Sequence, residues 1–466
     1  MEQASSSRAA SRQAVLLNHL RPAVSGQSQE NPIQAQACLA GDSAAYERRA
    51  SGLDDVVVIS ALRTPMCKAK RGALKDCPAD DMLAAVLQAT VDRTGVDPAA
   101  FGDVVIGSVL GPSSQRANEC RIAMFLAGYP ETVPVRTVNR QCSSGLQAVA
   151  DVAAAIRAGF YTVGLAGGVE AMSQTPMAWE GGVNPRAAKN RKAMSCLIPM
   201  GVTSENVAAK YGIAREVQDK MAVSSHQRAA KARETGRFKE EIVPVKTIWK
   251  DPKSGEEKDI LVEHDDGIRP DISTAALSKL KPVFKKDGST TAGNSSQVTD
   301  GAAAVLMMTR REALERQLPI LGIFRSFAAV GVDPAIMGVG PAVAIPEAVK
   351  QAGLSIDDID LFELNEAFAS QATYCCDKLG LDREKVNVNG GAIALGHPLG
   401  CTGARCTATL LHEMQKRGKS ARFGVVSMCI GSGMGAAAVF ERGGETDEPK
   451  NVRPAQKMSY LSRDAQ

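Results

Sequence analysis

The chain repeats one pattern of strands, loops and helices at a spacing of roughly 250–260 residues. The apolar runs 101–106 and 359–364 begin the two copies, and each contains an aspartate. In each copy a second strand follows, then a loop with glycine and cysteine, an alanine-rich helix and a third strand. The second strand, the helix and the third strand are at 135–139, 144–158 and 163–166 in the first copy, and at 386–389, 402–417 and 424–428 in the second. Strands that alternate with helices favour βαβ units. The repeat therefore predicts two stacked α/β domains related by a pseudo-twofold axis.

The two copies are separated by a stretch of different composition. Residues 174–288 are more charged and include helical runs near 204–211 and 215–235, so we expect an inserted lid. Residues 1–50 are rich in Ser, Ala, Gln and Arg and lack strand-like runs, which is typical of a targeting leader. The expected division is a leader at 1–50, an N-terminal domain at 51–173 and 289–317, the lid at 174–288, a C-terminal domain at 318–442 and a polar, disordered tail at 443–466.

The composition limits the classes of ligand. The 466 residues carry 55 basic and 51 acidic side chains, which is too balanced to favour nucleic acid as the main ligand. No apolar run approaches the roughly 20 residues that span a bilayer. The eleven cysteines show no metal-ligand spacing, and a chain with an extensive core has little need of a disulfide framework. We expect a soluble intracellular protein without a metal.

One cysteine lies between a predicted strand and a predicted helix, in the segment NRQCSSG (139–145). The helix macrodipole and the free N–H groups at that end favour a thiolate at Cys142. A free thiol has a pKa of about 8.5, and lowering it by about 2 units requires ~2.7 kcal/mol, of which a helix end supplies about 1. Cys142 is therefore a candidate nucleophile that needs a nearby base. The alternative is a buried structural cysteine.

Three further segments follow predicted strands of the second copy. GGAIALGHPLG (390–400) holds His397, a candidate base or oxyanion donor, on a rigid loop that a substrate can approach closely. NEAF (365–368) supplies Asn365, whose amide fixes a water or an oxyanion, or caps a helix. CIGSGMG (429–435) supplies Cys429 and exposed N–H groups, or forms only a tight turn. Because active sites of α/β sheets lie at the carboxyl ends of strands, the duplication predicts that these loops converge with Cys142.

These four segments, in this order, resemble the thiolase family over roughly residues 53–442, and the leader adds a likeness to the peroxisomal 3-ketoacyl-CoA thiolases of plants and green algae. The resemblance implies a thiolase fold, with two pseudo-symmetric domains stacked in an αβαβα layering and an inserted lid. It also implies an acyltransferase that cleaves 3-oxoacyl-CoA with CoA, as in fatty acid β-oxidation.

The resemblance assigns roles to the candidate residues. Cys142 matches the nucleophile that accepts the acyl group, and His397 the histidine that activates it and donates to an oxyanion. Asn365 matches the asparagine that holds a water in that oxyanion hole, and Cys429 the second cysteine, an acid/base. The backbone N–H groups of Cys142 and Gly431 match a second oxyanion hole.

The resemblance also implies how CoA is held and how the chain assembles. Met200 is expected beside the pantetheine arm and acyl chain, and Arg269 and Ser296 beside the CoA moiety. CoA is a substrate, no metal or redox cofactor is implied, and a homodimer is expected. Pro199 stands where thiolases of the short-chain biosynthetic type often have histidine. This difference weakens, but leaves open, an acetoacetyl-CoA-forming thiolase.

Two more distant alternatives are a condensing enzyme of the same superfamily and an inactive acyl-CoA-binding or scaffold protein. A ketoacyl synthase uses cysteine with two histidines, whereas this chain has NEAF and Cys429 at the other positions. Retention of all four chemical positions argues against an inactive protein.

The leader contains a nine-residue motif, RQAVLLNHL (12–20). On a helix Arg12, Leu16, His19 and Leu20 share one face. The motif resembles the type-2 peroxisomal targeting signal, so we expect a peroxisomal import receptor to bind it and the protein to reach the peroxisomal matrix. A mitochondrial or plastid transit peptide, also rich in Arg and Ser, is the alternative.

Two lid residues complete the predictions. Cys196 lies just ahead of Met200, so we hypothesise that it forms a reversible, inactivating disulfide with Cys142, since an accessible low-pKa thiolate is prone to oxidation. The alternative is an ordinary lid cysteine. His226 is expected to be a solvated helix residue.

Overall fold

The computed structural model describes residues 52–112, 115–175, 177 and 181–444. The predicted leader, its targeting motif and all but two residues of the predicted tail lie outside these ranges. Within them, no helix has the length and apolar character that crossing a membrane requires.

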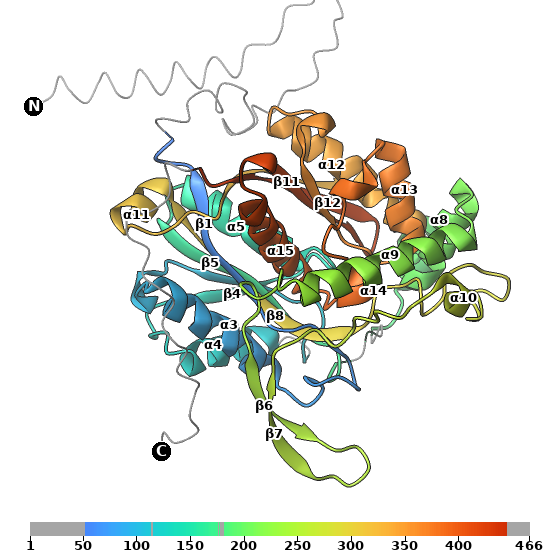
Figure 1. The fold of residues 1–466 in the computed structure, drawn as a ribbon, viewed down its shortest axis with the longest axis horizontal. Helices are drawn as coiled ribbons and strands as arrows, with labels where there is room; N and C mark the ends of the chain where they lie inside the picture. Colours follow the sequence, from blue (N-terminus) through green and yellow to red (C-terminus); the bar gives the residue numbers. More distant parts are fainter. Residues whose placement is uncertain (1–51, 113–114, 176, 178–180, 445–466) are drawn as a thin grey trace, which may run out of the picture. The chain divides into compact units, whose positions relative to one another are not determined.

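The core is a sheet in two halves (Figure 1). The first half has the order β4-β3-β5-β8-β1 and the second β9-β12-β11-β10, and a short pairing of β1 with β9 joins them. A two-residue strand, β2, pairs with β8. The bounds are β1 Val56–Arg63, β2 Cys67–Lys68, β3 Val104–Gly107, β4 Val135–Val138, β5 Val163–Ala171, β8 Thr299–Thr309, β9 Gly322–Gly331, β10 Leu361–Leu364, β11 Phe423–Ile430 and β12 Met434–Arg442.

The two halves have the same pattern of pairing. In the first, β3 pairs in parallel with β4 and β5, and β8 lies antiparallel between β5 and β1. In the second, β10 pairs in parallel with β11, and β12 lies antiparallel between β11 and β9. Val386 forms a parallel bridge to Phe362 at the place that β4 holds in the first half. The predicted pseudo-symmetric pair of α/β domains is confirmed.

The predicted strand at 386–389 is wrong, because the chain turns away after one bridging residue. Asn387 has a left-handed backbone, with φ of 47°. Its side chain accepts from the N–H of Leu364 at 2.8 Å and donates to the carbonyl of the same residue, also at 2.8 Å. A side-chain amide thus replaces the backbone partner that a strand would supply.

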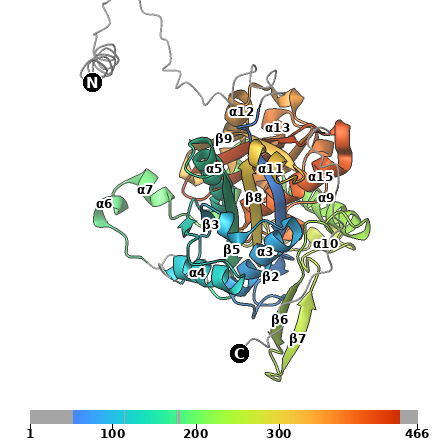
Figure 2. The same cartoon turned by 90° about the vertical axis from the view of Figure 1, so that its left-hand side faces the viewer.

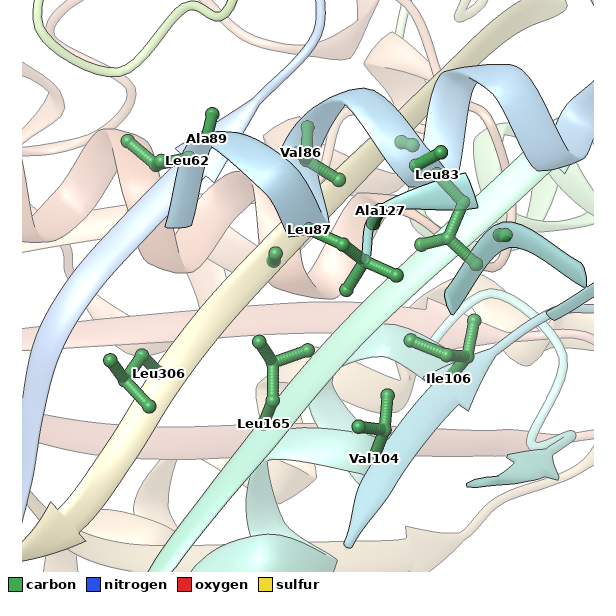
Figure 3. Close-up of a cluster of buried hydrophobic side chains, with 14 of the residues drawn as sticks. Leu62, Leu83, Val86, Leu87, Ala89, Val104, Ile106, Ala127, Leu165 and Leu306 are labelled. Atoms are coloured by element: carbon green, nitrogen blue, oxygen red, sulfur yellow. The ribbon is translucent and has the colours of Figure 1, made fainter. Parts of the chain in front are cut away.

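Two helices cover the outer face of the first half of the sheet. They are α3 Ala79–Thr94 and α4 Arg116–Leu126. Leu83, Val86 and Leu87 of α3 lie over Val104 of β3 and Leu165 of β5 (Figure 3). Fully burying side chains of this size contributes about 1.5–3 kcal/mol each, so this cluster fixes the first helical layer on the sheet.

Two helices lie between the halves, and two cover the outer face of the second half. The middle pair is α5 Ser144–Arg157 and α15 Thr402–Arg417, which share one core with strands of both halves. The outer pair is α12 Gly340–Gln351 and α13 Ala369–Leu379, packed on β9 to β12. The layers therefore alternate as helix, sheet, helix, sheet, helix, and the predicted αβαβα arrangement is confirmed. The short helices α11 Arg310–Glu315 and α14 Ala392–Leu395 lie in connections.

The segment between the halves forms further helices and a hairpin. They are α6 Pro185–Ala188, α7 Arg191–Ser195, α8 Met200–Tyr211, α9 Arg215–Glu234, α10 Thr274–Leu277, β6 Val245–Lys250 and β7 Glu257–Val262. The hairpin and α6 with α7 extend away from the sheets (Figure 2). Arg63 of β1 anchors the segment, because its buried guanidinium pairs with Glu241 at 2.6 Å and Asp265 at 2.7 Å. The predicted domain boundaries remain predictions.

Candidate active site

Cys142 lies in a tight turn between β4 and α5. Gln141 has a φ of 48°, a left-handed conformation that costs a non-glycine residue about 1 kcal/mol. Local hydrogen bonds hold this turn. The N–H of Gln141 donates to Asn139 Oδ1 at 2.9 Å, and the N–H of Arg140 donates to Ser144 Oγ at 2.9 Å. The turn sets Cys142 two residues ahead of Ser144, the first residue of α5.

Glycines let the first turns of α5 and α15 touch backbone to backbone. A Cβ on Gly145 of α5 would lie 2.7 Å from the carbonyl oxygen of Gly400. A Cβ on Gly403 of α15 would lie 2.1 Å from the backbone nitrogen of Leu146. Both contacts exclude any larger residue. Because α5 follows Cys142 and α15 follows the His397 loop, this crossing brings together two segments that are about 250 residues apart.

The thiol of Cys142 is almost fully buried, with 8% of the residue exposed. It packs with Met172 and Leu399. Burial raises the pKa of Cys142 to about 11, and the charge of Glu170 adds to this effect. The backbone N–H groups of Gly431 and of Cys142 itself interact with the sulfur and oppose the shift. The two amides that the resemblance assigns to a second oxyanion hole therefore lie at this sulfur.

The backbone N–H groups favour the thiolate of Cys142, as expected of a helix end, but the net pKa lies above the ordinary value rather than below it. Desolvation outweighs these amides, since water no longer stabilises the thiolate. With a pKa of about 11, only about 0.01% of the thiol is ionised at pH 7. Proton removal must therefore accompany the attack on substrate, which increases the dependence on a base.

His397 lies on the loop between α14 and α15 and is 5% exposed. Its Nδ1 is 2.6 Å from Thr402 Oγ1, which donates to the carbonyl of Pro398 at 3.2 Å. The hydroxyl proton is thus engaged, so Oγ1 accepts from Nδ1–H. This arrangement leaves the lone pair on Nε2, which faces Asn365 Nδ2 at 3.4 Å. His397 therefore presents a basic nitrogen to the site.

Burial and the charge of Arg405 lower the pKa of His397 to about 3. We expect kcat/KM for the reaction of this site to show no acid limb near pH 6.5, because His397 remains neutral well below that pH. Folding stability should decrease as the pH falls from 6.5 toward 3, since over that window the unfolded chain binds a proton at His397 that the folded chain does not. A pH–rate profile tests this prediction, and an acid limb with a midpoint between about 6 and 7 would contradict it.

Asn365 follows β10 and is 1% exposed. Its Oδ1 is buried and has no hydrogen-bond partner in the structure. Such an acceptor is costly unless a water satisfies it, so the geometry fits a bound water. Ser296 lies beside this segment, because its N–H donates to the carbonyl of Ala367 at 2.9 Å. The next residue, Gln297, accepts from the N–H of His397, also at 2.9 Å.

Cys429, near the end of β11, is fully buried, and burial raises its pKa well above the ordinary value. The neighbouring Cys142 contributes to that shift, which places the two thiols within electrostatic reach of each other. Met200 packs on Cys429 and Phe368, and a Cβ on Gly431 would lie 3.6 Å from Met200 Sδ. The four predicted chemical positions and Met200 are therefore brought to one site.

Arg269 lies farther out, as an exposed residue in the predicted lid. Its N–H donates to Nδ1 of His226 at 3.1 Å, and His226 is only 3% exposed. The expectation that His226 is a solvated helix residue is wrong. Burial, together with the charges of Arg269 and Lys68, lowers the pKa of His226 to about 4, so it acts as a neutral acceptor that fixes the backbone of Arg269.

Cys196 is exposed at the end of α7, and its thiol is free, as is that of Cys142. Its Sγ lies 3.8 Å from the carbonyl oxygen of Ser432, the residue after Gly431. Cys196 thus borders the loop that contacts Cys142, while the proposed disulfide remains a hypothesis.

A cavity of about 540 Å³ lies elsewhere, between α3 and the β6–β7 hairpin. None of the predicted site residues lines it. Two residues at the active site escaped prediction. Thr402 could have been suspected from its place five residues after His397, and Glu170 from its charge inside the apolar strand β5.

Two family models match the chain, the thiolase N-terminal domain over residues 56–311 and the thiolase C-terminal domain over residues 318–442. The chain is 65% identical over 459 residues to 3-ketoacyl-CoA thiolase 2, peroxisomal, of Arabidopsis thaliana, which covers 98% of this chain and 99% of that one. The solved structure of the dimeric peroxisomal thiolase of Saccharomyces cerevisiae is 46% identical, with a TM-score of 0.77, over 84% of this chain and 98% of that one. Human mitochondrial 3-ketoacyl-CoA thiolase in complex with CoA is 38% identical, with a TM-score of 0.75, over the same shares.

Apart from residues 113–114, 176 and 178–180, both matched domains lie within the described ranges, and each contributes loops to the site around Cys142. The same family is indicated by the duplicated fold, by the loops that converge on Cys142 and by the sequence identity over nearly the whole chain. The protein belongs to the thiolase family.

Proposed function

We propose that this protein is a 3-ketoacyl-CoA thiolase, an acyltransferase that uses CoA to cleave 3-oxoacyl-CoA into acetyl-CoA and a shortened acyl-CoA. The observation that carries the proposal is the meeting of a buried thiol, Cys142, with a neutral histidine, an amide acceptor without a partner and a second thiol. The names of the relatives, which are peroxisomal 3-ketoacyl-CoA thiolases, support the same substrate class. CoA acts as a substrate, and no cofactor is needed.

In the first half-reaction Cys142 attacks the 3-keto carbon while its proton passes to Nε2 of His397. A lone pair on that nitrogen suits the transfer. The C2–C3 bond then breaks, and its electron pair forms the enolate of acetyl-CoA. His397 now carries a proton on Nε2 and donates to the enolate oxygen, together with a water held by Asn365 Oδ1. A preorganised donor of this kind contributes about 3–4 kcal/mol to the transition state.

Cys429 protonates C2 of the enolate and releases acetyl-CoA. Its strongly raised pKa keeps the proton on sulfur until a base as strong as the enolate appears. In the second half-reaction Cys429, now a thiolate, takes the thiol proton of CoA, and the CoA sulfur attacks the acyl group on Cys142. The N–H groups of Cys142 and Gly431 stabilise the oxyanion of this step. Collapse returns the thiolate of Cys142, which recovers its proton from His397.

CoA is held by the lid and the segment before β8. Met200 lies against Gly431 and Cys429, which suits the end of the pantetheine arm. Ser296 lies beside Ala367, and the exposed guanidinium of Arg269 suits a phosphate. The relative solved with CoA supports CoA binding, and the dimeric yeast relative supports a homodimer.

We also propose that the protein works in fatty acid β-oxidation in the peroxisomal matrix, as the names of its relatives suggest. An import receptor is proposed to read residues 12–20 as a type-2 signal, a motif outside the described residues.

A series of 3-oxoacyl-CoAs of increasing chain length tests the function. With CoA, the purified protein should remove the magnesium-enolate absorbance of medium- and long-chain members and yield acetyl-CoA. Turnover of acetoacetyl-CoA alone would favour the acetoacetyl-CoA-forming alternative. No turnover at any length would refute the thiolase function.

Oxidation offers a further prediction for this site. Peroxide should inactivate the enzyme through a Cys142–Cys196 disulfide, and dithiothreitol should restore activity, because Cys196 is exposed beside the Gly431 loop. Peptide mapping should recover the linked pair. Cys196→Ser should not form it, whereas Cys77→Ser, which removes a buried thiol away from the site, should still form it. Full, reversible peroxide sensitivity in Cys196→Ser would contradict the hypothesis.

A further inference from the structure

Glu170 is a fully buried carboxylate beside the nucleophile that the proposed reaction does not use. It lies near the end of β5, with none of its surface exposed. Within the part of the chain that the structure describes, no lysine or arginine forms an ion pair with it. Arg116, which favours its charged form from a distance, pairs instead with Glu119. A buried charge without a partner is costly, so its retention calls for a reason.

The carboxylate accepts four hydrogen bonds from two separate loops. Oε1 accepts from Ser108 Oγ at 3.1 Å and from the N–H of Leu110 at 2.9 Å. Oε2 accepts from the N–H of Val109 at 2.9 Å and from the N–H of Gly400 at 2.8 Å. Burial raises the pKa of Glu170, but three of these donors are backbone N–H groups, which cannot accept, so they oppose that shift and favour the ionised carboxylate.

The two loops belong to different halves of the duplicated fold. Ser108–Leu110 follow β3 in the first half, and Gly400 lies three residues after His397 in the second. The approach leaves no room for a side chain at Gly400. A Cβ there would lie 2.4 Å from Ser108 Cα and 2.9 Å from Glu170 Oε2. Glu170 therefore joins the His397 loop to the first half through one side chain.

Four residues next to Glu170 or in the loops that it binds pack around Cys142. Cys142 packs with Leu399, the residue before Gly400, and with Met172, two residues after Glu170. Val109 and Leu110 pack against this cluster. Each of these four residues thus lies within two residues of Glu170 or of a backbone group that Glu170 binds. Glu170 therefore holds both the residues around Cys142 and the His397 loop.

We propose that Glu170 is a positioning residue for the thiolase reaction, whose carboxylate holds the His397 loop and the Val109–Leu110 loop in register over Cys142. The proposal rests on the proposed function, because it concerns the geometry between the nucleophile and its base. A small misplacement of the reacting groups should lower kcat strongly. It should leave KM for CoA nearly unchanged, because the CoA contacts lie away from Glu170.

The negative charge has a second, measurable consequence. It raises the pKa of Cys142, so its removal should increase the thiolate fraction. Other titratable groups near the two residues include the thiols of Cys429, Cys401 and Cys120 and the guanidinium of Arg116, and none of them is substituted in the variants below. Loss of positioning should lower turnover, while loss of charge should accelerate alkylation of the free thiol. These opposite signs separate the proposal from a general loss of structure.

The test compares Glu170→Gln with Glu170→Asp in the full-length protein. A glutamine cannot accept all four hydrogen bonds, so kcat per titrated Cys142 thiol should fall about 10- to 100-fold, with KM for CoA within about threefold. Iodoacetamide should alkylate Cys142 several-fold faster at pH 8. Glu170→Asp keeps the charge, so its alkylation rate should remain near that of the wild type although kcat falls. Glu413→Gln, which removes another buried carboxylate, should leave kcat per thiol within about twofold.

Three results would overturn the proposal. The first is a folded Glu170→Gln variant with kcat per thiol within twofold of the wild type. The second is equal acceleration of alkylation in Glu170→Gln and Glu170→Asp, which would indicate a loosened structure. The third applies if Glu170→Gln does not fold. In that case Ser108→Ala, which removes one donor and keeps the charge, should lower kcat about two- to fivefold. An unchanged kcat in Ser108→Ala would then refute the positioning role. A wild-type enzyme without thiolysis would instead refute the underlying function.

Discussion

Cys142→Ala should lower kcat for thiolysis by at least about 10⁴-fold, because no other group at the site can hold the acyl chain as a thioester. Cys429 is another thiol at the site, but it is fully buried, and burial raises its pKa well above the ordinary value. The measurement is loss of 3-oxoacyl-CoA absorbance with CoA. Intact-protein mass spectrometry after substrate is added without CoA should show an acyl adduct on the wild type and none on Cys142→Ala.

A second buried cysteine serves as the matched control for this substitution. Cys77 is 1% exposed and packs beneath α3, away from the site. Cys77→Ala removes the same atoms from a similarly buried position, so kcat should remain within about threefold of the wild type. The role of Cys142 would be refuted if Cys142→Ala kept more than about 1% of the wild-type kcat, or if the acyl adduct mapped to another residue.

His397→Gln should lower kcat by about 10²–10⁴-fold, because glutamine donates a hydrogen bond but cannot take the proton of Cys142. The effect should be large because the pKa of Cys142, about 11, leaves almost no thiolate without a base. Formation of the acyl-enzyme should become the slow step. Rapid-quench measurement of the adduct should therefore show a burst in the wild type and a single slow phase in the variant.

The control for this substitution is a buried histidine outside the site. His412 is 8% exposed, and its Nε2 lies 2.9 Å from the carbonyl oxygen of Ala61. An amide can replace that contact, so His412→Gln should keep kcat within about threefold. A His397→Gln enzyme with kcat within tenfold of the wild type would assign the base to another group.

Much of the site was predictable because Cys142 and Asn365 follow strands, Cys429 lies near the end of one, and glycines flank His397 in its loop. The spacing of the repeat predicted that Cys142 and His397 lie at corresponding ends of two similar domains, and hence near each other. What the spacing could not predict was the contact itself. It depends on Gly145, Gly400 and Gly403, whose missing side chains let α5 and α15 touch.

The protonation states were not predictable from local sequence. The helix end at Cys142 indicates a lowered pKa, yet burial raises it, since desolvation depends on residues brought from both domains. His226 is a similar case. It lies on a helix in a polar stretch and reads as solvated, but the backbone of Arg269 covers it.

The sequence by itself determined the duplicated α/β fold and predicted the four chemical residues, because strand periodicity, glycine placement and residue type are local properties. Only the tertiary structure decided the tautomer of His397, the direction in which the pKa of each thiol is shifted and the hydrogen bonds by which Glu170 joins two loops. Each of these depends on how far groups distant in the sequence exclude water and share hydrogen bonds, and neither quantity exists until the two halves pack around α5 and α15.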